Sequence, residues 1–338
     1  MPWWPAASAE RWRWFLMIEI PSITLNTGTK MPIIGQGTFG SDKYTPDQIA
    51  QAVYGAVSCG CRLIDCAEVY GNEAEIGQTL RRLMEDKVVT REELFITSKV
   101  WNDHHRNVRA ACEGSLEALG LAYVDLYFIH WPFPNYHAPG CSGDARNPDS
   151  KPFSVEEFVD TYRQCEELYH EGKIRAIGIS NMTVSKLQAV LPHLKVMPAA
   201  MEMELHPAFQ QKELLRFALD HGIRPIGFCP LGSPSRPERD KTSQDVAAME
   251  MPVIQKIARA HGIHPSGVCL KWASQMGAVP IPFSVKQPQY EANFRAVCED
   301  PLTREEMEQI ANADCNCRLI KGQVFLWEGA TDWQELWT

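Results

Sequence analysis

Residues 62–100 read RLIDCAEVYGNEAEIGQTLRRLMEDKVVTREELFITSKV, and their pattern decides the fold. The segment begins with a short apolar run, Arg62–Cys66, continues with an amphipathic stretch, Asn72–Met84, and ends with a second apolar run, Leu94–Lys99. A helical period between two buried strands is typical of a β-α-β unit, whose two strands are parallel. The segment therefore predicts one β-α-β unit.

The alternation continues in both directions and favours a (β/α)8 barrel, of the TIM type, over a doubly wound sheet. The strand-like runs are 31–37, 62–66, 94–99, 124–130, 174–180, 199–204, 224–229 and 278–282. The helical stretches between them are 45–58, 72–84, 108–119, 154–170, 184–191 and 210–221. The first helix opens with Thr45-Pro46 and the third ends in Gly120, which are usual helix start and stop signals.

The flanking segments define the domain organisation. Residues 20–25 and 30–33 surround Asn-Thr-Gly and predict a β-hairpin that plugs the barrel floor. The segment 132–152 follows the fourth strand, so we expect it to overhang the C-terminal mouth, where barrel active sites lie. Residues 1–16 hold four tryptophans without a signal-peptide pattern, and we interpret them as a disordered or start-site extension. We expect residues 17–338 to form one domain.

Composition excludes several functional classes. The 338 residues are 45% hydrophobic and carry a net charge of −9, with no basic stripe for a nucleic acid. No apolar run approaches the roughly 18 residues of a membrane helix. The eleven cysteines lie mostly within strand and helix patterns, which indicates reduced thiols and a cytoplasmic location. Two C-x-C pairs, at 59–61 and 315–317, lack the spacing of a zinc site, so we expect no metal.

A glycine motif offers a competing interpretation. Gly35-Gln-Gly37-Thr-Phe-Gly40 matches the G-x-G-x-x-G fingerprint of Rossmann domains, and Asp65 closes the next strand. In a Rossmann domain the helix follows the glycines directly, whereas here the helix signal at Thr45 comes five residues after Gly40. We interpret the motif as a tight turn at a strand end.

Four polar residues follow neighbouring strands and converge on the barrel mouth: Asp65, Tyr70, Lys99 and His130. Each alone has an ordinary explanation as a cap, rim filler, solvated charge or core histidine. Together they suggest acid-base chemistry, because an ammonium beside a tyrosine favours its phenolate and lowers the cost of giving up the proton. Asp65 can hold the Lys99 ammonium, and His130 can bind a substrate carbonyl. An alternative is a non-redox barrel in which Lys99 forms a Schiff base.

These residues lie in motifs that resemble the aldo-keto reductase superfamily, over nearly all of residues 18–320. LIDCAEVYGNEAEIG is similar to the family's Asp and Tyr signature, FITSKVWN to its Lys signature, and YFIHWP to its His signature. The resemblance implies a catalytic tetrad of Asp65, Tyr70, Lys99 and His130, with Tyr70 as the general acid in reduction. It also implies a barrel that binds NADPH or NADH without a Rossmann domain.

The same resemblance implies the cofactor contacts. They are Thr38, Ser180, Asn181, Glu202, Phe228, Cys229, Leu231, Ser233, Ser284, Lys286 and Asn293. Glu202 stands where the family has a carboxamide-binding Gln, and Phe228 where it has a ring-stacking Tyr. Phe283 and Gln289 replace basic residues that clamp the adenosine 2′-phosphate, which makes use of NADH credible, while Lys286 could restore part of the clamp. We therefore expect dual use of the two cofactors.

The pocket residues implied by the resemblance are Phe39, Trp101, Asn102 and Trp131. The Trp-Asn pair resembles the sugar-reducing branch, so we expect reduction of aldoses or related carbonyl compounds to alcohols. The segments 132–152 and 317–337 would set specificity. The competing interpretation is a dinucleotide-binding barrel with a regulatory or structural role, because fold alone does not settle function. The expected partner is a small carbonyl substrate, and the protein is expected to be a monomer or weak homo-oligomer.

Overall fold

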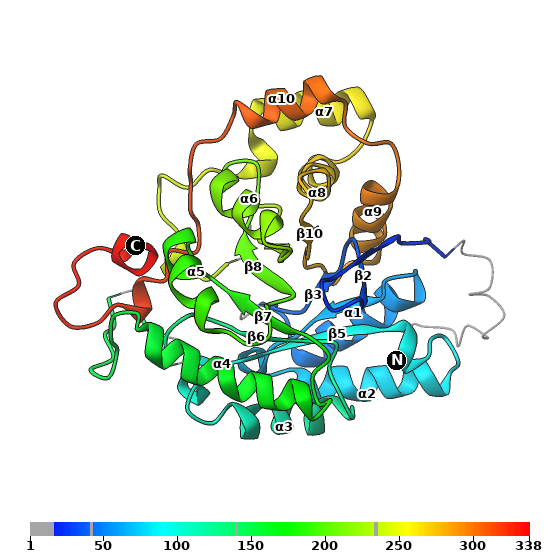
Figure 1. Cartoon of the computed structure of the whole chain (residues 1–338). Coiled ribbons are helices and arrows are strands. Elements are labelled where there is room, and N and C mark those ends of the chain that lie inside the picture. Colours follow the sequence, from blue (N-terminus) through cyan, green and yellow to red (C-terminus); the bar gives the residue numbers. More distant parts are fainter. Residues whose placement is uncertain (1–16, 41–42, 139–140, 143, 233–235) are drawn as a thin grey trace.

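A computed structural model of the chain describes residues 17–40, 43–138, 141–142, 144–232 and 236–338. Within them, eight strands form one parallel sheet in chain order (Figure 1). The strands are β3 (Gln36–Gly37), β4 (Leu63–Asp65), β5 (Phe95–Val100), β6 (Leu126–Ile129), β7 (Ile177–Ser180), β8 (Ala200–Glu204), β9 (Arg224–Phe228) and β10 (Val279–Pro280). Gly35 N donates to Pro280 O (3.1 Å) and Gly37 N donates to Pro282 O (2.9 Å), so the first strand meets the last. The predicted (β/α)8 barrel is confirmed.

Helices surround the strands (Figure 1). They are α1 (Pro46–Ser58), α2 (Glu73–Glu85), α3 (Val108–Leu119), α4 (Val155–His170), α5 (Val184–Val190), α6 (Lys212–Asp220), α7 (Pro252–His261), α8 (Pro265–Gln275), α9 (Gln287–Cys298) and α10 (Arg304–Ala311). α1 begins at a capping box between Thr45 and Gln48, and α3 ends at Gly120 with a φ of 66°. Among the described residues, none of these helices is long and apolar enough to cross a membrane.

The predicted floor hairpin is formed by β1 (Ser22–Thr24) and β2 (Lys30–Pro32), which pair in antiparallel register. Leu25 and Met31 pack inside the barrel against Leu63 and Phe95, which lie at the beginnings of β4 and β5. The hairpin therefore closes the N-terminal end of the barrel, and a site can open only at the other end.

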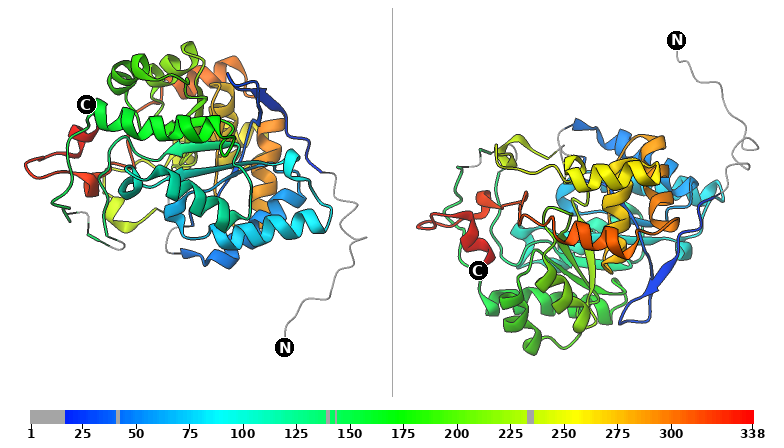
Figure 2. Two further views of the ribbon diagram at one scale, coloured as in Figure 1. Left: turned by 60° about the horizontal axis from the view of Figure 1, so that its bottom comes forward. Right: turned by 90° about the horizontal axis from the view of Figure 1, so that it is seen from above.

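The C-terminal segment, residues 317–337, and the loop after β6 form one wall at the open end of the barrel. Trp131 and Phe133 from the loop pack against Phe325 and Leu336 in a separate apolar cluster, with 4.6 Å between the ring centroids of Trp131 and Phe325. Both segments lie on the side opposite the hairpin (Figure 2). The predicted overhang at the C-terminal mouth is thus present.

Glu204, the last residue of β8, attaches the C-terminal segment to the barrel. Its buried carboxylate accepts hydrogen bonds from Leu319 N (2.7 Å) and Ile320 N (2.9 Å), and it pairs with His206 Nε2 (2.9 Å). These contacts hold the pKa of Glu204 below its usual value despite burial, so the carboxylate is ionised.

The structure corrects the first predicted strand, 31–37. Its beginning belongs to the hairpin strand β2 and its end to the barrel strand β3, with a bend at residues 33–34 between them. Both parts are buried, Met31 in β2 and Gln36 in β3, and the apolar Ile34 between them is buried too, so the burial pattern alone does not separate them. Residues 1–16, interpreted above as an extension, lie outside the described residues.

Candidate active site

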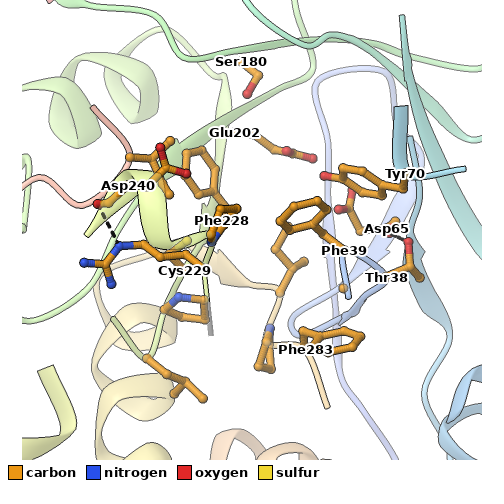
Figure 3. A pocket seen from close by; sticks show the side chains of 18 of the residues that line it. Thr38, Phe39, Asp65, Tyr70, Ser180, Glu202, Phe228, Cys229, Asp240 and Phe283 are labelled. Atoms are coloured by element: carbon orange, nitrogen blue, oxygen red, sulfur yellow. Dashed lines mark hydrogen bonds between the residues drawn. The ribbon is translucent and has the colours of Figure 1, made fainter. Parts of the chain in front are cut away.

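A cavity of about 960 Å³ opens at the carboxyl ends of the barrel strands. Its lining includes Asp65 at the end of β4, His130 after β6, Ser180 at the end of β7, Glu202 within β8 and Phe228 at the end of β9. Figure 3 shows Glu202, Tyr70 and Asp65 directed toward one another on one side of this space. Carboxyl ends of parallel strands meet at one face of a barrel, which is why residues far apart in the sequence come together.

The predicted tetrad forms one contiguous group. Lys99 Nζ lies beneath the cavity, fully buried, and donates to Asp65 Oδ1 (2.5 Å) and Cys66 O (2.9 Å). The same amine lies 5.4 Å from the centroid of the Tyr70 ring. The His130 ring stands edge-on to Tyr70, with 5.8 Å between ring centroids. Asp65 therefore holds the ammonium beside the tyrosine, as the sequence predicted.

Burial controls the protonation states of this group. Burial lowers the pKa of Lys99, but the carboxyls of Asp65 and Glu202 raise it by more, so the amine stays protonated. Burial also raises the pKa of Tyr70, and the Lys99 charge offsets only part of this. Lys99 therefore acts in the expected direction, and Tyr70 in the protein alone is a protonated phenol, the form that a general acid needs. Burial and the Lys99 charge hold the pKa of His130 well below its usual value, so the imidazole is neutral.

Asn181 supplies the test of whether a nicotinamide cofactor fits. Its left-handed backbone, with a φ of 58°, turns its side chain so that Nδ2 donates to His130 O (2.8 Å) and Ser180 Oγ (3.1 Å). Its buried Oδ1 has no hydrogen-bond partner among the described residues. An orphaned acceptor costs about 1–3 kcal/mol, so a ligand amide that donates to it fits this position. The residues present therefore fit a cofactor carboxamide.

The opposite end of the cavity is lined from the loop after β10 and from α9. Ser284 Oγ donates to Gln289 Oε1 (2.8 Å), and the Phe283 ring packs beside Tyr44 with 5.6 Å between centroids. Asn293 is buried and lines the same space. Hydrogen-bonding amides and an apolar ring thus occupy the positions where the family resemblance implied basic residues.

Most predicted cofactor contacts line the cavity. They are Thr38, Ser180, Asn181, Glu202, Phe228, Cys229, Leu231, Ser284 and Asn293. Lys286 is not part of this lining and is exposed at the residue that precedes α9. Ser233 lies outside the described residues.

Three of the four predicted substrate contacts reach the cavity. Phe39 is 48% exposed at the rim, and Trp101 and Trp131 line the wall with Phe325. Asn102 is fully buried outside this lining, and its Nδ2 donates to Asn135 O in the loop after β6. The structure therefore corrects Asn102 from a substrate contact to a residue that holds the loop.

Sequence reasoning missed several polar residues of the lining, among them Arg236, Asp240, His264 and Ser266. Arg236 donates from Nε to Asp240 O (3.2 Å) and pairs with Asp245, while His264 and Ser266 stand at the start of α8. The His264-Pro265 pair is a helix-start signal that could have located α8, but nothing in the sequence places that helix end at the cavity.

Comparisons with known proteins agree with this geometry. A model of the aldo/keto reductase family matches residues 33–314. An aldo/keto reductase of Synechocystis sp. is 40% identical over 93% of this chain and 95% of its own length. An NADH-dependent D-xylose reductase of Candida parapsilosis is 35% identical over 88% of this chain and 94% of its own. The crystal structure of a Bombyx mori aldo-keto reductase in complex with NADP superposes with a TM-score of 0.79 at 29% identity, covering 90% of this chain and 95% of that one.

Proposed function

Because the chain belongs to the aldo/keto reductase family and is an NAD(P)H-dependent oxidoreductase acting on small carbonyl compounds, we propose that it reduces them with Tyr70 as the proton donor. The observation that carries the proposal is the group formed by Asp65, Lys99 and Tyr70 beside His130 at one cavity. A purely structural barrel has no need of a buried ammonium at this position. The bound cofactor supplies the hydride.

Each residue of the group has a separate task. The neutral imidazole of His130 donates its N–H to the substrate carbonyl and orients it. Tyr70 gives its phenolic proton to the carbonyl oxygen as negative charge develops there. The Lys99 ammonium, held by Asp65, stabilises the phenolate that remains. In alcohol oxidation the same phenolate accepts the proton.

The wall of the cavity favours aldehydes with an apolar or aromatic substituent. Trp101 packs against His130 (5.0 Å between centroids) and against Phe325 (5.9 Å), and Phe39 contributes a further ring. Aldoses are the second candidate, supported by the resemblance to the D-xylose reductase and by Asp103 and His137 on the same wall. Since Asn102 lies outside the lining, the hydroxyl contact expected from the Trp-Asn pair does not support the sugar substrate.

A substrate panel tests this proposal. We expect oxidation of NADH or NADPH with aromatic aldehydes, aldoses and uronates, with kcat/KM for aromatic aldehydes about tenfold or more above that for aldoses, since burying a ring contributes about 1.5–3 kcal/mol. A higher value for aldoses would reverse the order of the two candidates. Tight cofactor binding without turnover of any substrate would instead favour the dinucleotide-binding role.

Phe283 provides a prediction about cofactor choice. Phe283→Lys places a cation beside Ser284 and Gln289, and a charge-assisted hydrogen bond contributes about 1.5–3 kcal/mol. We therefore expect the ratio of the NADH to the NADPH dissociation constant, measured by fluorescence titration, to rise about tenfold to a hundredfold. Phe283→Leu is the control for loss of the ring and should leave the ratio nearly unchanged. An unchanged ratio in the lysine variant would show that the adenosine 2′-phosphate of NADPH does not bind beside residue 283.

A further inference from the structure

Two carboxyl groups share one ammonium in the interior of the barrel. Lys99 Nζ lies 2.5 Å from Asp65 Oδ1 and 3.2 Å from Glu202 Oε1, and all three side chains are at most 4% exposed. A single buried positive charge cannot neutralise two carboxylates, and carboxyl groups that share a site do not both ionise. One of the two therefore keeps a proton.

The hydrogen bonds assign that proton to Glu202. Asp65 Oδ1 accepts from both Thr97 Oγ1 (2.6 Å) and Lys99 Nζ (2.5 Å), which suits an ionised carboxylate. Glu202 Oε1 is buried and lies 3.2 Å from Lys99 Nζ without the alignment of a full hydrogen bond, and its carboxyl also lies beside that of Asp65, a contact that requires a proton on one of the two. Burial and the Asp65 charge raise the pKa of Glu202 well above its usual value, in agreement with this assignment.

Glu202 also faces the place where hydride transfer must occur. Figure 3 shows its carboxyl directed toward Tyr70 and Asp65. Because Tyr70 has to reach the carbonyl oxygen, the hydride donor has to lie within a few ångströms of the same carbonyl. Reduced nicotinamide is neutral, whereas oxidised nicotinamide is a cation, and a nearby cation favours the ionised form of a carboxyl. The titratable or charged groups around Glu202 are Asp65 on β4, Tyr70 after β4, Lys99 on β5, His130 after β6 and Cys229 after β9.

We propose that Glu202 is a neutral carboxylic acid while the nicotinamide is reduced and gives up its proton when the nicotinamide is oxidised. This inference rests on the function proposed above. During turnover a proton of the Lys99 ammonium passes to the Tyr70 phenolate, and the resulting neutral amine takes the proton of Glu202, whose O–H bond breaks. The phenol is thereby restored, Lys99 remains an ammonium, and Glu202 becomes a carboxylate. When oxidised cofactor binds from solution, the same proton leaves to solvent. Glu202 acts through Lys99 and does not touch the reacting carbonyl.

Calorimetry of cofactor binding in buffers of different ionisation enthalpy tests the proposal without turnover. At neutral pH we expect the whole chain to release about one proton when it binds NAD⁺ or NADP⁺ and close to none when it binds the reduced forms, because only the oxidised ring shifts the ionisation of Glu202. Equal proton release for oxidised and reduced cofactor, or none for either, would overturn the proposal.

Matched variants identify the source of the proton. Glu202→Gln should abolish the release while retaining cofactor binding, and Glu204→Gln, two residues along β8 and ionised in the native protein, should retain the release. Tyr70→Phe should retain the release and lose turnover, which separates a failure of this proposal from a failure of the proposed function. Proton release that persists in Glu202→Gln would assign it to another group and refute the proposal.

Infrared spectroscopy gives a second measurement that needs no variant to fold. We expect the carbonyl band of a protonated carboxyl in the native protein to disappear when oxidised cofactor binds and to remain when reduced cofactor binds. With glutamate labelled by carbon-13, the band should shift, because it belongs to Glu and not to Asp65. A band that is absent at neutral pH, or one that does not shift with the label, would contradict the assignment.

Discussion

Tyr70→Phe is expected to lower kcat for carbonyl reduction by a factor on the order of 10²–10⁴, because a positioned proton donor contributes rate enhancement of that size. The phenol is the acidic group directed into the cavity beside His130, and its neighbour Lys99 is fully buried beneath the lining. Removal of one hydroxyl should leave the cofactor dissociation constant nearly unchanged. Steady-state kinetics with NADH and NADPH, together with a fluorescence titration of each cofactor, measure the two quantities.

Tyr54→Phe is the matched control for this variant. The Tyr54 hydroxyl donates to Asp86 Oδ2 (2.9 Å) on the outer helices, so its loss should not change kcat. A Tyr70→Phe enzyme with nearly native kcat would assign proton delivery to another group, and His130 would be the next residue to replace.

Lys99→Met is expected to have the second largest effect, and it should reduce stability as well as activity. The substitution removes the ammonium from between Asp65 and Glu202 and leaves an uncompensated buried carboxylate, which costs about 3–5 kcal/mol. We expect the free energy of unfolding, measured in urea at pH 7, to fall by about this amount and reduction to be lost.

The pH dependence of this loss provides an independent check. Without Lys99 no cation remains beside the buried carboxyl groups, so over a range of pH the folded protein keeps a proton that the unfolded chain has released. The stability of Lys99→Met therefore rises as the pH falls through that range. The deficit, which is the free energy of unfolding that the variant loses relative to the native protein, should become smaller toward acid pH. In the double variant Asp65→Asn/Lys99→Met the deficit at pH 7 should be smaller than in Lys99→Met alone. Equal deficits would show that lost packing, and not the unpaired charge, causes the instability.

The barrel and the grouping of the four tetrad residues at its mouth were predictable because both follow from regular patterns. Alternating strands and helices predict the barrel, and the carboxyl ends of its strands bring Asp65, Lys99 and His130 to one face. The split of the first strand into β2 and β3 was not predictable in the same way, because both parts are buried and so is Ile34 at the bend between them.

The features of the site that the sequence did not predict concern irregular backbone and solvation. Asn102 follows β5 and begins a single 3-10 turn, Asn102–His104, which directs its side chain away from the cavity. No periodic pattern specifies such a turn. The protonation of Tyr70 depends on how much water the fold removes from it, and the sequence shows which charge is near but not how deeply the group is buried.

The attachment of the C-terminal segment through Glu204 has a consequence for how new activities arise in this fold. The segment supplies Ile320, Val324 and Phe325 to the cavity, yet its backbone is fastened at the rim, apart from the residues that handle protons. Mutations within it can therefore alter which molecules are admitted without disturbing the acid-base group. Substrate preference can therefore diverge through Ile320, Val324 and Phe325 while the residues that handle protons stay the same.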